Sequence, residues 1–98
     1  MASLYTVIVR KTLYDSSLDV NDFDESRFYF ASPAAILRKM PEILYRFDEI
    51  IEVLDEGRPD GMTVDEVAAY LANRDNLTKP LHFTDELSIV CASEVLYE

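Results

Sequence analysis

Apolar residues follow two kinds of pattern along the chain, one typical of strands and the other of helices. Residues 4–13 are rich in β-branched and aromatic side chains, which is typical of a β-strand. Residues 27–30, Arg-Phe-Tyr-Phe, predict a second, short aromatic strand. Near the other end of the chain, residues 81–84 predict a short strand and residues 87–96 a final, longer one.

An acidic segment separates the first two predicted strands. Residues 15–25 contain five acids and no base, namely Asp15, Asp19, Asp22, Asp24 and Glu25. Serine and asparagine residues among them add turn-forming side chains, so we expect a solvated loop here. The group Asp22, Asp24 and Glu25 could bind a hard cation, but the spacing is not that of an EF-hand loop and the glycine of such a loop is missing.

The helical pattern is a long apolar stripe in the middle of the chain. Ser32 and Pro33 form a good helix start, because serine caps the first turn and proline is tolerated at the first helical position. The stripe consists of Ile36, Leu37, Met40, Ile43, Leu44, Phe47, Ile50, Ile51 and Leu54, and Gly57 ends it. Pro41 costs about 3 kcal/mol inside a helix, whereas burial of the stripe gains on the order of 15–20 kcal/mol. We therefore expect either one helix kinked at Pro41 or two helices that share one face.

A shorter helix is predicted after the turn-forming residues 57–61. Thr63 and Glu66 have the spacing of a capping box, and apolar residues continue from there to Leu71. Strands at both ends of the chain with helices between them predict an α+β fold, in which a small, mostly antiparallel sheet carries the longer and the shorter helix on one face. The length of 98 residues suits a single domain, residues 1–98.

The composition argues against enzymatic chemistry. Two glycines exclude a glycine-rich phosphate loop, and a single histidine excludes any site that needs a histidine cluster. His82 and Cys91 could in principle form a nucleophilic pair, but no basic neighbour activates the thiol and no third residue orients the histidine. A buried structural cysteine on a strand is the favoured interpretation. We expect no enzymatic activity, no cofactor and no metal site.

The sequence also favours a cytoplasmic location. No stretch approaches the roughly 20 apolar residues that a transmembrane helix needs, and residues 1–10 lack the features of a signal peptide. The free cysteine, Cys91, fits a reducing compartment. If the protein is encoded by a phage, the expected location is the cytoplasm of the host cell.

Charge is the strongest indication of partners. The chain has 19 acids and 9 lysines and arginines, which gives a formal net charge of -10. This balance opposes direct binding to nucleic acid or to an anionic membrane. The negative electrostatic potential attracts proteins with basic surfaces, which are most common among nucleic-acid-binding proteins.

Five acids fall within one arc of the predicted helix, opposite the apolar stripe. They are Asp48, Glu49, Glu52, Asp55 and Glu56, with Glu42 about a turn earlier. Most such rows are simply solvated. Like charges four residues apart, however, destabilise a helix by about 0.2–0.5 kcal/mol per pair, which a purely structural helix could avoid, and only Arg46 interrupts the row.

We assign partner binding to these five acids, to Tyr45 and to three acids of the predicted loop. Tyr45, one of six tyrosines, lies at the boundary between the stripe and the acidic arc, and tyrosine is enriched in protein interfaces. The loop contributes Asp22, Asp24 and Glu25.

A very small acidic α+β chain with a row of carboxylates and no catalytic set resembles the anti-CRISPR and anti-restriction inhibitors of phages and mobile elements. The features that carry the resemblance are the row within residues 48–56 and the acidic residues 15–25. The resemblance implies a type of action, in which acidic side chains mimic DNA and occupy the nucleic-acid channel of a nuclease or a CRISPR surveillance complex. The expected function is therefore inhibition of DNA binding by a basic partner.

Two alternatives stay open. One is an immunity protein or antitoxin that neutralises a nuclease. The other is a small regulatory adaptor, because residues 62–71 resemble the first helix of a helix-turn-helix, as in excisionase-like DNA readers. Residues 72–80, however, offer no basic recognition helix.

Overall fold

Four antiparallel strands form one sheet in a computed structural model of the chain, which describes residues 2–15 and 20–96 without the side chains of residues 2–3, 13–15, 20–23 and 94–96. The order across the sheet is β2-β1-β4-β3. The strands are β1 (Ala2–Asp15), β2 (Val20–Phe30), β3 (Leu81–His82) and β4 (Leu87–Leu96). The first strand of the sequence is therefore central, while β2 lies at one edge of the sheet and the short β3 at the other.

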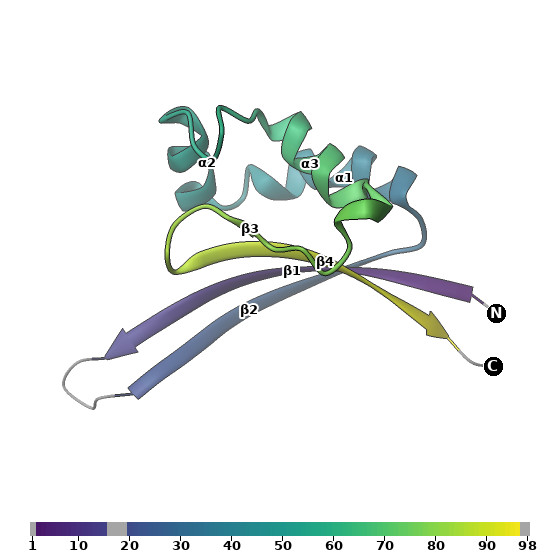
Figure 1. Cartoon of the computed structure of the whole chain (residues 1–98), viewed down its shortest axis with the longest axis horizontal. Coiled ribbons are helices and arrows are strands. Elements are labelled where there is room, and N and C mark those ends of the chain that lie inside the picture. The colour runs from purple at the N-terminus through teal and green to yellow at the C-terminus, as the bar shows by residue number, and fades with distance from the viewer. Residues whose placement is uncertain (1, 16–19, 97–98) are drawn as a thin grey trace.

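Three α-helices lie together on one face of this sheet (Figure 1). They are α1 (Pro33–Leu44), α2 (Asp48–Asp55) and α3 (Val64–Ala72), and a 3-10 turn, η1 (Arg74–Asn76), follows the last of them. Figure 1 shows the opposite face of the sheet without a covering helix. The predicted α+β fold with an antiparallel sheet is confirmed.

The hydrophobic core lies between the sheet and the helices. In β1, Tyr5, Val7 and Val9 are buried, and they alternate along the strand because successive side chains point to opposite faces. Val7 lies opposite Phe28 of β2 and opposite Cys91 of β4. Alternate residues of the three long strands thus form one side of the core, and the apolar sides of the helices pack on them.

The prediction of a loop over residues 15–25 is wrong. Only residues 16–19 lie outside the described strands, and β2 begins at Val20. Asp22, Asp24 and Glu25 are therefore strand residues, paired with Leu13, Lys11 and Arg10 of β1. Two of the three acids face a base across the ladder, and opposite charges on paired strands are favourable, so an acidic segment can extend the hairpin.

The apolar stripe is divided between two helices, as in the second of the two alternatives. The break does not fall at Pro41, which lies inside α1, but after Leu44. Phe47 adopts an extended backbone there and begins α2. Its ring meets Phe28 of β2 edge to face, with 6.2 Å between ring centroids, a favourable aromatic geometry. Phe47 therefore packs on the sheet at the point where the chain leaves the direction of α1 and begins α2.

Both predicted helix caps are confirmed. The Ser32 hydroxyl accepts a hydrogen bond of 3.2 Å from the Ala35 amide. Thr63 accepts from the Glu66 amide at 3.2 Å, and the Glu66 carboxylate accepts from the Thr63 amide at 3.3 Å. Side chains thus satisfy amide groups that have no partner within the helix.

The stability of the fold depends on only one side of α1. Ile36 is fully buried in the core, whereas its neighbour Leu37, which the stripe also included, is 49% exposed. We expect Ile36→Ala to lower the free energy of unfolding by about 3 kcal/mol, because it leaves a cavity. Leu37→Ala, the matched control, should change it by no more than about 0.5 kcal/mol. Chemical denaturation measures both, and equal losses would contradict this placement of α1.

Candidate functional site

The strongest concentration of like charge in the described structure lies on α2. Its outer side carries the five predicted acids, all of them exposed, whereas Ile50 and Val53 on the inner side are buried. We call Asp48, Glu49, Glu52, Asp55 and Glu56 the α2 acidic face; Glu56 is the C-cap residue of the helix. The helical period places the carboxylates outward simply because the apolar residues must face the core.

Two of these five carboxylates have partners within the protein. Glu49 forms an ion pair with Lys11 of β1, and Glu56 forms one with Arg58 in the turn that follows α2. The hydrogen bond to Glu49 raises the pKa of Lys11 above its usual value. Both pairs are exposed, and such pairs contribute little to stability.

The remaining three carboxylates, those of Asp48, Glu52 and Asp55, form no ion pair with any residue that the structure describes. They are spaced by four and three residues, which aligns them on one side of the helix over about 10 Å. The structure therefore presents an aligned row of three carboxylates available to a partner.

A cleft of about 310 Å³ opens beside this row, between the start of α2 and the sheet. Val9, Ile50 and Leu87 supply apolar surface. Asp24, Asp48 and Glu49 add carboxylates, and Lys11 and Arg46 are the bases that line it. Of the two acids from the predicted loop whose side chains the structure describes, Asp24 shares a cleft with the α2 acidic face and Glu25 does not.

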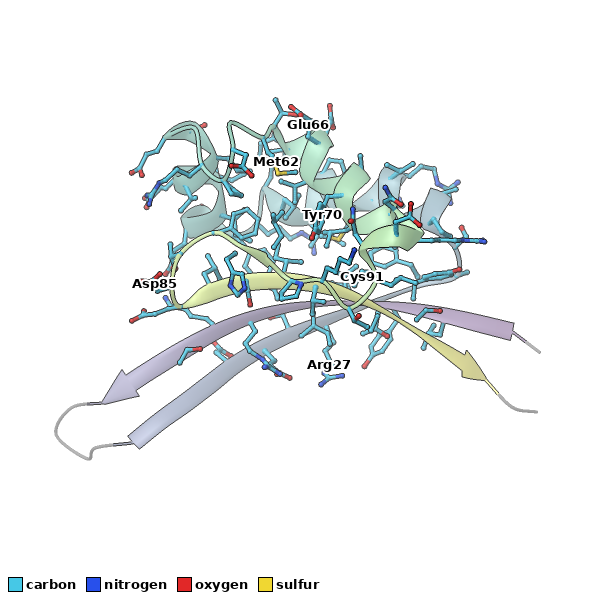
Figure 2. All side chains as sticks on the ribbon, viewed as in Figure 1. Arg27, Met62, Glu66, Tyr70, Asp85 and Cys91 are labelled. Atoms are coloured by element: carbon cyan, nitrogen blue, oxygen red, sulfur yellow. The ribbon has the colours of Figure 1, made fainter. Side chains whose placement is uncertain are left out.

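Glu25 belongs to a different surface. The Nε atom of Arg10 donates a hydrogen bond of 2.7 Å to its carboxylate, and Arg27 donates one of 3.2 Å. Figure 2 shows Arg27 on the side of the sheet away from the helices. Glu25 is therefore held by two guanidinium groups on the open face and does not join α2, while the side chain of Asp22 lies outside the described residues.

Tyr45 is 65% exposed and caps the end of α1, three residues before α2 begins. Around it the charge changes sign. Residues 33–46 contain three bases and one acid, namely Arg38, Lys39, Arg46 and Glu42, whereas residues 48–56 contain five acids and no base. The acidic character of α2 thus does not extend onto α1, a boundary that the net charge alone does not reveal.

Sequence reasoning missed Lys11, and it named Asp24 as a partner-binding residue but placed it in a loop, not opposite Lys11. Lys11 reaches Glu49 across 38 positions of sequence and lies opposite Asp24 in the ladder. No local pattern signals either contact, because both depend on the register of the hairpin and on where α2 lies over the sheet.

The other candidate chemistries find little support in the described residues. Cys91 is buried, and burial raises the pKa of its thiol, whereas His82 is exposed on the edge strand β3. A 3-10 turn and then a strand follow α3, so no second helix of a helix-turn-helix forms there. Within the described ranges no cluster of His, Cys, Asp and Glu could hold a metal ion, and no helix could cross a membrane.

No family model, curated protein or solved structure matches this chain. Its function has to follow from the chemistry of the surface itself.

The two arginines beside Glu25 allow a direct test of the charge arrangement on the open face. Hydrogen bonds from Arg10, and then from Arg27, lower the pKa of Glu25 below its usual value. In a carboxyl-carbon NMR titration, Arg10→Gln should raise this pKa, and Arg27→Gln should raise it less.

The pH dependence of stability has a corresponding sign. Because folding lowers the pKa, Glu25 stabilises the fold above the pKa of the unfolded chain and loses this effect as pH falls through the folded value. The difference in unfolding free energy between the protein and Glu25→Gln should therefore shrink as the solution is acidified. An unchanged pKa in Arg10→Gln would contradict the arrangement.

Proposed function

We propose that the protein is an inhibitor that binds the basic, nucleic-acid-binding surface of a partner and prevents that partner from binding DNA. The observation that carries the proposal is the aligned row of Asp48, Glu52 and Asp55, exposed and without an ion pair to any described residue. Carboxylates that are not paired internally can be desolvated against lysine and arginine at an interface without first breaking a bond within the protein.

The arrangement suits a surface that normally holds phosphates. The net charge of -10 steers a basic partner toward the protein and repels nucleic acid. At contact, the row on α2 offers successive anionic groups along about 10 Å. The partner would then contact either the inhibitor or DNA, and the two would compete.

The neighbouring cleft gives the interface an anchoring point. An arginine or lysine of the partner has a long apolar stem and a cationic end, and the cleft combines apolar surface with the carboxylates of Asp24 and Asp48. Most interfaces derive much of their binding energy from a few residues in such pockets. The resemblance to anti-CRISPR and anti-restriction inhibitors implies that the partner is a DNA-binding protein of a defence system, such as a nuclease or a CRISPR surveillance complex.

The test is a competition assay with labelled duplex DNA and purified nucleases and surveillance complexes. We expect the protein to raise the apparent Kd of a susceptible partner for DNA in proportion to its own concentration, and to cause no shift of DNA on its own. The triple variant Asp48→Asn, Glu52→Gln, Asp55→Asn should inhibit at least about tenfold less well, since each charged hydrogen bond contributes about 1.5–3 kcal/mol. Inhibition should also weaken as salt is raised.

A matched control neutralises three exposed acids on other elements. The variant Glu42→Gln, Asp65→Asn, Asp75→Asn removes the same charge from the whole molecule but leaves α2 intact. It should inhibit within about twofold of the original, because only long-range steering changes. Equal losses in the two triple variants, or inhibition that is independent of salt, would exclude mimicry of DNA by the α2 acidic face.

A further inference from the structure

A second hollow, of about 620 Å³, lies on the other side of the α1–α2 break, between β2 and α1. One wall is strand β2, from Arg27 to Phe30, and the other is α1 with the residue that follows its cap. The helix contributes Lys39, Glu42 and Ile43, and Arg46 follows its cap. We call this hollow the β2–α1 groove.

The strand that lines this groove is an edge strand. In the sheet order β2-β1-β4-β3, β2 pairs with β1 on one side only. Outside that ladder, residues 20–30 make no backbone hydrogen bond to a described residue. The outer N–H and C=O groups of β2 are therefore available to pair with another extended chain.

The charge of the groove is opposite to that of the whole protein. Its lining includes three bases, Arg27, Lys39 and Arg46, and one acid, Glu42, although the chain as a whole carries -10. Arg27 also pairs with Glu25, whereas Lys39 and Arg46 form no ion pair with any described residue. Two exposed cations thus stand beside a free strand edge.

We propose that the β2–α1 groove binds an acidic peptide segment of a partner protein in extended conformation, as an additional strand next to β2. Backbone hydrogen bonds to the strand edge would supply affinity that does not depend on sequence, and the flanking side chains would supply specificity. This interaction surface is separate from the α2 acidic face and does not require the proposed inhibition.

Strand geometry specifies the sequence pattern of the peptide. Alternate side chains of an added strand point toward the helix layer and away from it. Those on the helix side meet Lys39 and Arg46 beside Ile43, which favours acidic residues at these positions. Those on the other side meet Arg27 and Tyr29, which is 61% exposed, and this favours a further acid or an apolar residue.

Other occupants fit less well. A second copy of the chain would bring another -10 charge to the same edge, and its own β2 carries acids at Asp24 and Glu25 beside Arg27. Nucleic acid would meet two or three cations on a molecule whose overall field repels phosphates. A short acidic peptide experiences the local cations without a large opposing charge of its own.

The test uses a fluorescein-labelled peptide of alternating glutamate and valine, measured by anisotropy and by amide chemical shifts of the full-length protein. We expect saturable binding, with the largest shifts at residues 27–30 and 39–46. The variant Lys39→Glu, Arg46→Glu should weaken binding at least about tenfold, because it reverses the two bases of the groove that form no ion pair with a described residue. The control variant Arg38→Glu, Arg74→Glu reverses two exposed bases outside the groove and should change binding by no more than about twofold.

Two further peptides separate strand addition from simple charge attraction. A peptide of alternating lysine and valine should not bind, and the glutamate peptide with alternate backbone nitrogens methylated should bind at least about tenfold more weakly, since it has lost its donors. The proposal is overturned if the methylated peptide binds equally well, if the two double variants have equal effects, or if binding does not saturate by about 1 mM peptide. It is also overturned if an oligothymidine binds more tightly at the same residues, or if the protein forms a dimer that occludes the edge of β2.

Discussion

Burial of one face of the central strand β1 is the constraint on which the other features depend. Val7 and Val9 are buried beneath the helices, and a shift of one residue in pairing would turn both toward the open face. The register that keeps them inside also sets Arg10 opposite Glu25 and Lys11 opposite Asp24. The charges of the hairpin are therefore arranged by the packing of the core, and this arrangement decides which acids are neutralised.

Much of the fold could be predicted because its signals are local. The β-branched strand at residues 4–13, the final strand at residues 87–96 and the caps Ser32 and Thr63 each depend on neighbouring residues, and all are confirmed. The beginning of β2 and the break after Leu44 depend on distant residues. The acids of residues 20–25 indicate a loop until β1 supplies bases opposite them, and the break falls where Phe47 meets Phe28, 19 positions away.

The same distinction applies to the candidate site. Helical periodicity alone could place the five carboxylates of residues 48–56 on the outer side of α2, and the structure shows them exposed. It could not predict that Lys11 would pair with Glu49 while Asp48, Glu52 and Asp55 remain without such a partner, because that pairing spans 38 residues. The edge position of β2 could not be predicted either, because it follows from the order of the strands in the sheet and not from a local pattern within residues 20–30.

The distribution of charge matters more than its sum. At physiological ionic strength exposed charges farther apart than about 8 Å are largely screened from one another, so a partner at contact experiences the nearest groups. For a basic partner at α2, the local row and the net charge act in the same direction, and added salt weakens both. For an acidic peptide at the β2–α1 groove, Lys39 and Arg46 attract while the net charge of -10 repels. Moderate salt screens the long-range repulsion before the short-range attraction, so the two surfaces differ in salt response as well as in sign.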